Sequence, residues 1–124
     1  MKKLKGYIFS RSFMGERVPQ HIQNIVIRNY CQNSNYEYLL SATEYAMADC
    51  HMVLKQTILE SQNFDGIVLY SLFQLPETNA DRLIVVKALL DKKKQLHCAV
   101  ENIQINNIND FNEIDLIWQI KKTI

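Results

Sequence analysis

The sequence predicts an α/β fold: a doubly wound, mainly parallel sheet of four strands with flanking helices and one more helix at the carboxyl end. Two observations lead to this prediction. Short apolar runs alternate with longer segments of helical period along nearly all of the 124 residues. Residues 67–70 form a continuous apolar run, as expected for a parallel strand that is covered on both faces. The length suits one domain, so we expect residues 1–124 to fold as a unit.

The first half of the chain is expected to hold two strand–helix pairs. Residues 4–10 are typical of a strand, and a loop with Gly15 leads to a helix at Pro19, where a missing N–H needs no partner. A second strand is expected at residues 36–42 and a second helix at residues 47–61. Apolar spacing places these side chains on the inner faces of the two helices: Ile22, Ile25, Val26, Tyr30, Val53, Leu54 and Ile58.

The second half of the chain repeats the pattern. After the strand at residues 67–70, we expect a loop closed by Pro76, a third helix at residues 78–93 and a last strand at residues 95–101. The Asn-rich stretch 102–109 is expected to be a loop, and Asp110 is a suitable cap for a terminal helix. The broad apolar side of that helix, Phe111, Ile114, Ile117, Trp118 and Ile120, favours packing into the core. The alternative is a homodimer surface, because Trp118 and Ile124 are costly to leave in water.

The composition restricts the partners and the compartment. A formal net charge of +1 gives no long-range field for nucleic acid or an anionic membrane, so neither is expected as a partner. No apolar segment has the length of a signal-peptide core before Ser10, and none has the length of a membrane span. A cytoplasmic protein is expected, and nothing in the sequence calls for a cofactor.

The cysteines indicate neither disulfides nor a metal site. They are three in number, lie far apart and never form a Cys-x-x-Cys pair. The pairs Cys50-His51 and His97-Cys98 lack convincing ligand spacing, and neighbours on a strand point to opposite faces. Buried, inert thiols are the expected state of Cys31, Cys50 and Cys98.

Right-handed crossovers place the functional loops of such a sheet beyond the carboxyl ends of its strands. Polar residues gather in the corresponding segments, which are residues 10–17, 41–47, 70–77 and 101 onward. We therefore expect the functional site at the carboxyl edge of the sheet.

Two arginines at this edge are the expected anion anchor. Arg11 and Arg17 flank the Gly15 loop that leads into a helix. Free amides at a helix amino terminus attract anions, and guanidinium groups add bidentate hydrogen bonds to phosphate or carboxylate. The alternative for both is a surface position or an ion pair with one of three acidic residues, Glu16, Glu44 or Glu77.

Hydroxyl, amide and carboxylate groups at the same edge suit a carbohydrate, because sugar hydroxyls need both donors and acceptors. The hydroxyl and amide candidates are Ser10, Tyr70, Ser71 and Gln74, for which ordinary loop capping is the alternative. Either Glu44 or Glu101 can act as a general base if burial raises its pKa. Glu44 is the preferred one, and an ion pair with Arg11 or Arg17 is the competing interpretation.

The Gly6-Tyr7 opening, residues 64–68 and the Leu72-x-x-Leu75 loop resemble the catalytic domain of serine recombinases, of resolvase and invertase type, over residues 4–103. The resemblance implies a resolvase-like architecture, but it does not extend to the chemistry. Aligned without a gap, Phe9 and Arg11 occupy the positions of the family's arginine and nucleophilic serine. A shift by one pleat places Ser10 and Ser12 there instead, which restores a serine but still lacks the arginine. Residues 73–77 lack the arginines of its Asp-Arg-Leu-x-Arg element. A phosphodiester transition state would then lose its main electrostatic support, so recombination is not expected.

Four blocks also resemble sporadic carbohydrate cluster proteins, a family of small bacterial proteins that accompany surface-polysaccharide gene sets. These blocks are residues 6–11, 13–24, 40–47 and 70–76. The resemblance implies a role in carbohydrate biosynthesis and names no reaction.

Two hypotheses follow. The first is an enzyme of surface-polysaccharide or lipopolysaccharide sugar biosynthesis, such as an isomerase or lyase, that binds a sugar phosphate or nucleotide sugar and uses acid/base chemistry. Its expected catalytic residues are Glu44, Tyr70 and Ser10. Its expected substrate-binding residues are Arg11, Arg17, Gln20, Tyr45, Ser71 and Gln74. The second is a non-catalytic accessory or ligand-binding subunit of a carbohydrate-biosynthesis complex.

Overall fold

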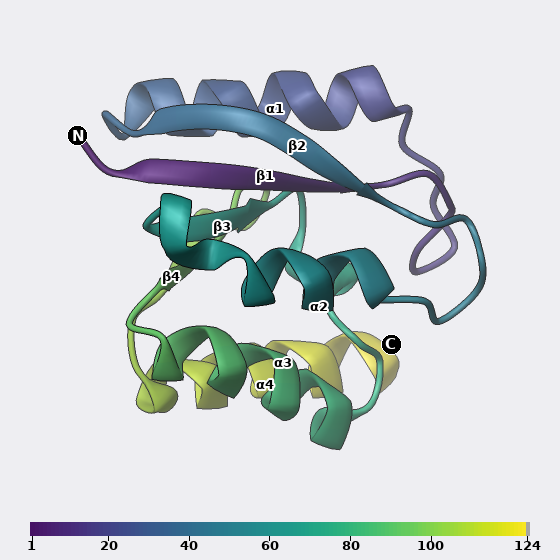
Figure 1. Ribbon diagram of the computed structural model, residues 1–124. Coiled ribbons are helices and arrows are strands. Elements are labelled where there is room, and N and C mark those ends of the chain that lie inside the picture. The colour runs from purple at the N-terminus through teal and green to yellow at the C-terminus, as the bar shows by residue number, and fades with distance from the viewer. Residues whose placement is uncertain (124) are drawn as a thin grey trace.

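The computed structural model describes residues 1–123, which form one five-stranded sheet with helices on both faces (Figure 1). The strands lie in the order β2-β1-β3-β4-β5. Their bounds are Lys3–Phe9 (β1), Glu37–Glu44 (β2), Gly66–Leu69 (β3), Gln95–Cys98 (β4) and Ile103–Ile105 (β5). Strands β1 to β4 run parallel, and β5 pairs with β4 in the antiparallel direction. The predicted α/β class and mainly parallel sheet are confirmed.

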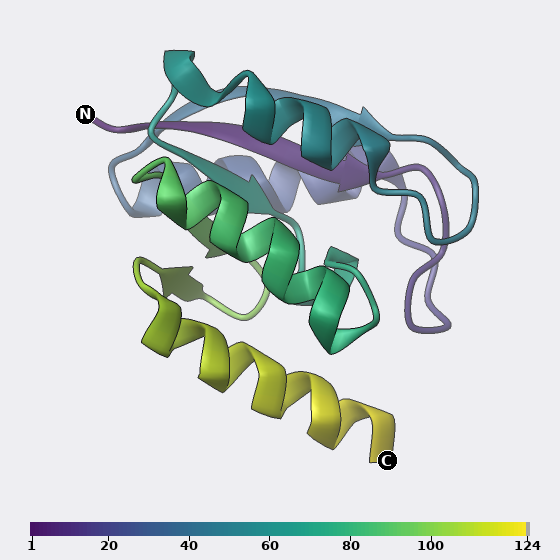
Figure 2. The ribbon, with the colours of Figure 1, turned by 60° about the horizontal axis from the view of Figure 1, so that its bottom comes forward.

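The helices are divided unequally between the two faces. They are α1 (Gln20–Asn33), α2 (Met52–Leu59), α3 (Asn79–Asp91) and α4 (Ile108–Thr123), with short 3₁₀ turns η1 (Ser61–Asn63) and η2 (Leu72–Gln74). Helix α1 alone covers one face, whereas α2, α3 and α4 lie on the other, as Figures 1 and 2 show. No helix within residues 1–123 is long and apolar enough to cross a membrane.

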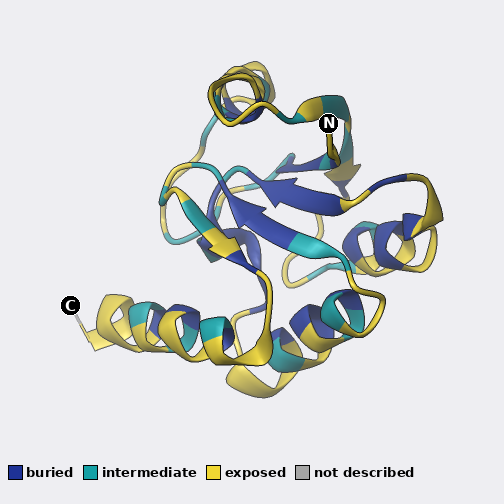
Figure 3. Cartoon of the chain, turned by 90° about the vertical axis from the view of Figure 1, so that its left-hand side faces the viewer, coloured by how far each residue is buried: buried dark blue, intermediate teal, exposed yellow. Residues whose placement is uncertain are grey.

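Alternate side chains of the strands form two apolar clusters, one on each face of the sheet. Leu4, Ile8 and Val68 pack with Ile27 and Cys31 of α1. The larger cluster on the opposite face joins the sheet to α2, α3 and α4, and β1, β3 and β4 are mostly buried (Figure 3). Burial of each large apolar side chain contributes about 1.5–3 kcal/mol. The two clusters therefore hold the sheet rigid beneath its carboxyl-edge loops.

The sheet has five strands, where four were predicted. The predicted last strand ends early, at Cys98, and Asn102 adopts a positive φ of 54° in the turn that follows. Ile103 and Ile105 then pair with Cys98 and Leu96, inside the stretch that was expected to be a loop. Alternation of apolar and polar residues predicts a strand, but here only two isoleucines alternate among asparagines, which is too few.

Helix α2 is shorter than expected. It begins at Met52 rather than near residue 47, and Asp49 has a positive φ of 58° that no helix accommodates. Strand β2 extends to Glu44 rather than ending at Ala42. The Glu44 side chain accepts hydrogen bonds from the amides of Val53 and Leu54, which fixes where the helix starts.

The inner face of α1 differs from the predicted one. Its buried residues are Gln23, Ile27 and Cys31, whereas Ile22 and Ile25 are exposed. Tyr30 of the predicted stripe is half-buried and packs against the cluster on this face, so the prediction was right for that residue. The buried glutamine displaces the rest of the stripe from the position that apolar periodicity indicated.

Helix α4 packs into the core through Phe111, Ile114 and Trp118, which confirms the favoured interpretation. Ile120, which was expected on the same side, is exposed, and Ile124 lies outside the described residues. Arg82 of α3 forms a 2.7 Å ion pair with Asp115 of α4 and lies over the Trp118 ring. This contact fixes α4 against α3.

Candidate functional site

Strands β1 and β3 are neighbours in the sheet, and the strands that follow them along the chain lie on opposite sides of this pair. Strand β2 lies beside β1, and β4 lies beside β3. The chain leaves β1 through α1 on one face and leaves β3 toward α3 on the other (Figure 2). Loops that part in this way leave a crevice at the carboxyl edge, where ligands of open α/β sheets bind. The expected position of the site therefore coincides with the topological switch point.

The loop between β1 and α1 contains a tight turn. Phe13 and Glu16 exchange both backbone hydrogen bonds, at 2.9 and 3.0 Å. Met14 and Gly15 between them have φ values of 50° and 76°, as two-residue hairpin turns require. The Phe13 ring packs edge-on against Phe9, which ties the turn to the core.

A cavity of about 440 Å³ lies beside the amino terminus of α1. Four predicted site residues line it, Ser10, Arg11, Arg17 and Gln20, together with Phe9, Val18, Pro19 and His21. The first turn of α1 contains no acidic residue, and Pro19 gives it no side-chain cap. No acidic side chain lines this cavity, so two arginines and the positive end of the helix dipole face it together.

The two arginines differ in how firmly they are held. The Arg11 guanidinium lies 4.0 Å from the centre of the Phe9 ring and donates a 2.9 Å hydrogen bond to the carbonyl of Tyr45. Arg17 is exposed. Within residues 1–123 the Arg82–Asp115 pair is the sole salt bridge, so the alternative ion pairs of Arg11 and Arg17 with Glu16, Glu44 or Glu77 do not form. The donors of Arg11 that do not contact the Tyr45 carbonyl, and those of Arg17, remain available to an anion.

Arg11 and Phe9 also line a second cavity, of about 250 Å³. Ser12, Asp49, His51 and Glu77 supply its polar groups. Two carboxylates, a hydroxyl and an imidazole in one small space offer both donors and acceptors to a polyhydroxylated ligand. Arg11 therefore lines both cavities, one that attracts anions and one that offers partners to hydroxyl groups.

Glu44 is buried and its carboxylate is fully used within the protein. It accepts hydrogen bonds from the Tyr7 hydroxyl at 2.7 Å and from the amides of Val53, Leu54 and Tyr45 at 2.9, 3.1 and 3.2 Å. Burial acts to raise the pKa of Glu44, but these hydrogen bonds outweigh it and hold the pKa below its ordinary value. The general-base role expected of Glu44 requires the opposite shift.

Gln74 is likewise buried and committed to internal contacts. Its Nε2 donates to Oε1 of Gln23 at 2.8 Å, and its Oε1 accepts from the amide of Ser71 at 3.3 Å. No face of this amide reaches the cavities that are lined by Arg11. Gln74 therefore does not line the candidate site. Its hydrogen-bond partner Gln23 was not among the residues that the sequence indicated.

Ser71 and Glu101 form a capping pair at the end of β3. The Ser71 hydroxyl donates to Glu101 at 2.8 Å, and the amide of Leu72 donates to the same carboxylate at 2.9 Å. The loop-capping alternative therefore describes Ser71 well. Tyr70 is half-buried against Phe13, and burial, with the nearby charges of Glu16 and Glu101, raises its pKa.

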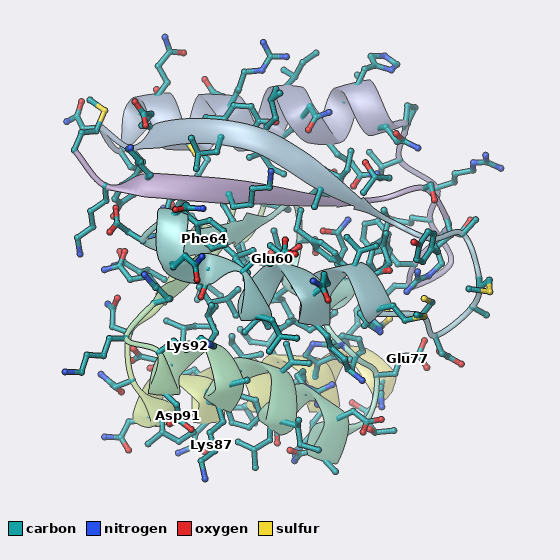
Figure 4. The ribbon with its side chains drawn as sticks, in the orientation of Figure 1. Glu60, Phe64, Glu77, Lys87, Asp91 and Lys92 are labelled. Atoms are coloured by element: carbon teal, nitrogen blue, oxygen red, sulfur yellow. The ribbon has the colours of Figure 1, made fainter. Side chains whose placement is uncertain are left out.

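Ser10 and Tyr45 lie at the junction of β1 and β2. The Ser10 hydroxyl donates to the backbone carbonyl of Glu44 at 2.8 Å, which leaves its oxygen free to accept a further hydrogen bond. Tyr45 is exposed and lines a groove of about 840 Å³ between α2 and the β1–β2 side of the sheet. That groove extends to Glu60 and Phe64, labelled in Figure 4, and contains neither arginine. We place the candidate site at the smaller, switch-point cavities because charges converge there.

The cysteine–histidine pairs are separated by the fold. His97 is buried on the α1 face, 2.6 Å from the Tyr30 hydroxyl, whereas Cys98 packs in the opposite cluster. The Cys50 thiol is 3.6 Å from the Glu44 carboxylate. Across residues 1–123, no three His, Cys, Asp or Glu side chains gather in a way that could hold a metal ion.

Comparison with known proteins bears on the fold. The N-terminal catalytic domain of TP901-1 integrase has a TM-score of 0.69 and 17% identity, over 96% of this chain and 95% of that one. The fold is of the resolvase type. A resolvase family site-specific recombinase from Streptococcus pneumoniae gives the same TM-score at 11% identity, over 97% of this chain and 89% of that one. No protein-family model and no curated protein sequence matches the chain.

The resolvase-type fold carries different residues at the expected recombinase positions. Phe9, which takes the family's arginine position in the alignment without a gap, is buried in the core, and Arg11, which takes the serine position in that alignment, lies over the Phe9 ring. Gln74 and Glu77 occupy the loop that carries the family's arginines. At such low identity the two solved structures show a shared fold and no shared activity.

Proposed function

We propose that this protein binds an anionic, hydroxyl-bearing small molecule, a sugar phosphate or nucleotide sugar, as a cytoplasmic ligand-binding or accessory subunit in bacterial surface-carbohydrate biosynthesis. The observation that carries the proposal is the cavity at the switch point. Arg11 and Arg17 line it beside the uncapped amino terminus of α1, and neither pairs with an acidic side chain within residues 1–123. Such a site attracts phosphate.

The carbohydrate part of the proposal draws its support from sequence. Two of the blocks that resemble sporadic carbohydrate cluster proteins, residues 6–11 and 13–24, contain every residue that lines this cavity. The neighbouring cavity, with Ser12, Asp49 and Glu77, adds acceptors for hydroxyl groups. A ligand that carries an anionic group and several hydroxyl groups in one molecule fits both cavities.

A binding role is preferred over catalysis because Glu44 has no free lone-pair direction and a lowered pKa. The second candidate is an enzyme that uses Tyr70 and Ser10. The raised pKa keeps the Tyr70 phenol protonated, so it can donate a hydrogen bond to a ligand oxygen, and the Ser10 oxygen can accept one from a ligand hydroxyl. Turnover of a bound sugar phosphate by the isolated protein, lost in Tyr70→Phe, would favour this candidate.

A thermal-shift screen tests the proposal. The probes are inorganic phosphate, hexose phosphates, nucleotide sugars and the matching neutral hexoses. A ligand that binds only the folded state raises the melting temperature, and 100-fold excess over Kd contributes about 2.7 kcal/mol. We expect a rise with phosphorylated sugars and none with neutral hexoses. The same melting temperature with every probe would overturn the proposal.

A further inference from the structure

The side chain of Gln23 is completely buried and uses every hydrogen-bonding position that it has. Its Oε1 accepts from the Phe9 amide at 3.0 Å and from Gln74 at 2.8 Å. Its Nε2 donates to the carbonyls of Phe9 at 2.9 Å and Val18 at 2.8 Å. A carboxamide offers two donors and two acceptor directions, so Gln23 is saturated.

Three of these four bonds go to the two ends of one loop. Phe9 is the last residue of β1, and Val18 immediately precedes Pro19 at the start of α1. The loop between them carries both Arg11 and Arg17, which line the same cavity. One side chain therefore ties the base of the loop that presents both guanidinium groups.

We propose that Gln23 is the positioning residue of the anion site: it clamps both ends of the loop and so holds Arg11 and Arg17 ready for one ligand. This inference rests on the proposed function. A loop that is ordered before binding loses less conformational entropy when the ligand arrives, and the affinity is higher for that reason. Gln23 itself is completely buried and does not line the cavity, so its effect on a ligand is indirect.

Gln74 provides a matched control. It is as deeply buried as Gln23 and belongs to the same network. Its side chain bonds to Gln23 and to the amide of Ser71, and it contacts neither Phe9 nor Val18 through a hydrogen bond. Loss of Gln74 leaves the clamp on the loop, whereas loss of Gln23 removes it.

The experiment compares Gln23→Met with Gln74→Met in the full chain. Methionine keeps a similar volume and removes the amide. Three quantities are measured: the free energy of unfolding in urea, amide hydrogen exchange of residues 10–18 relative to β1 and β3, and the affinity for a hexose phosphate. We expect both variants to be less stable. Only Gln23→Met should speed exchange selectively in residues 10–18 and weaken binding by about tenfold or more.

The experiment distinguishes failure of the proposed function from failure of the inference about Gln23. If the wild-type protein binds no probe, the proposed function is wrong, and selective exchange in Gln23→Met still decides whether Gln23 orders the loop. If binding occurs but both variants change exchange and affinity alike, Gln23 is merely structural and the inference is wrong. Gln23→Asn keeps an amide that is too short to reach both ends. It replaces Gln23→Met should that variant not fold, with the same selective effect expected and the same contrary result.

Discussion

The Tyr7 hydroxyl donates a 2.7 Å hydrogen bond to the Glu44 carboxylate across the β1–β2 pair. The amides of Val53 and Leu54 approach the same carboxylate from α2. One acidic side chain thus joins two strands to the start of a helix, and it supplies the negative charge that the helix dipole favours there. This arrangement explains why α2 begins where it does.

Replacement of Glu44 should lower stability without removing the anion site. Glu44→Gln keeps one acceptor oxygen and turns the other into a donor that faces the donors of α2. We expect a decrease of about 1–3 kcal/mol in the free energy of unfolding, measured by urea denaturation. Glu37→Gln, an exposed change in the same strand, is the control. A Glu44→Gln protein of unchanged stability would contradict the capping role.

The same carboxylate should make stability depend on pH. The pKa of Glu44 is lower in the folded protein than its ordinary value of 4.5. The stabilisation is therefore complete above that ordinary value, and it is lost as the pH falls through the folded pKa. The slope of unfolding free energy against pH in this acidic range should be shallower in Glu44→Gln than in the wild type. Parallel slopes would show that Glu44 is not the responsible group.

His97 should contribute a separate pH dependence at higher pH. Burial, with the charge of Lys2, lowers its pKa from 6.5 to about 4. The unfolded chain therefore takes up a proton first, and stability decreases as the pH falls from about 6.5 to about 4. His97→Gln should remove this component, whereas His21→Gln, at an exposed histidine, should keep it. The check is chemical denaturation at a series of pH values; an unaltered profile in His97→Gln refutes the assignment.

The Arg82–Asp115 pair should be essential for the docking of α4. Arg82 is only 3% exposed and Asp115 is 14% exposed in their side chains, so the pair is nearly dry. Asp115→Ala leaves a buried guanidinium without its partner and should cost about 3 kcal/mol or more of unfolding free energy. Trp118 fluorescence should report a looser α4. Glu113→Ala, an exposed change on the same helix, should have little effect. Similar losses in the two variants would contradict the docking role.

Much of the fold was predictable because long apolar runs report burial directly. The run at residues 67–70 correctly indicated a strand, and Leu69 and Val68 indeed pack into clusters on opposite faces of the sheet. Strand β5 was not predictable, because its two inward isoleucines give too short a signal. The inner face of α1 was misassigned because Gln23 is polar in sequence and core in structure.

The candidate site stays a prediction, but the sequence located its loop. Ser10, Arg11, Arg17 and Gln20 follow one strand within a single short segment, and they line one cavity. The position of a polar residue in a loop could not show whether its side chain is available to a ligand or hydrogen-bonded within the fold. Glu44 and Gln74 find their partners at distant positions, such as Leu54 and Gln23, and these pairings exist only in three dimensions.

The most direct test of the anion site is calorimetric titration of a hexose phosphate into three proteins: the wild type, Arg17→Ala and Arg28→Ala. Arg17 lines the cavity, whereas Arg28 is an exposed arginine later in α1 and keeps the overall charge change identical. We predict a loss of about tenfold or more in affinity for Arg17→Ala, as expected when a charged hydrogen bond is removed, and no loss for Arg28→Ala. Equal affinity in all three proteins would contradict the proposed site.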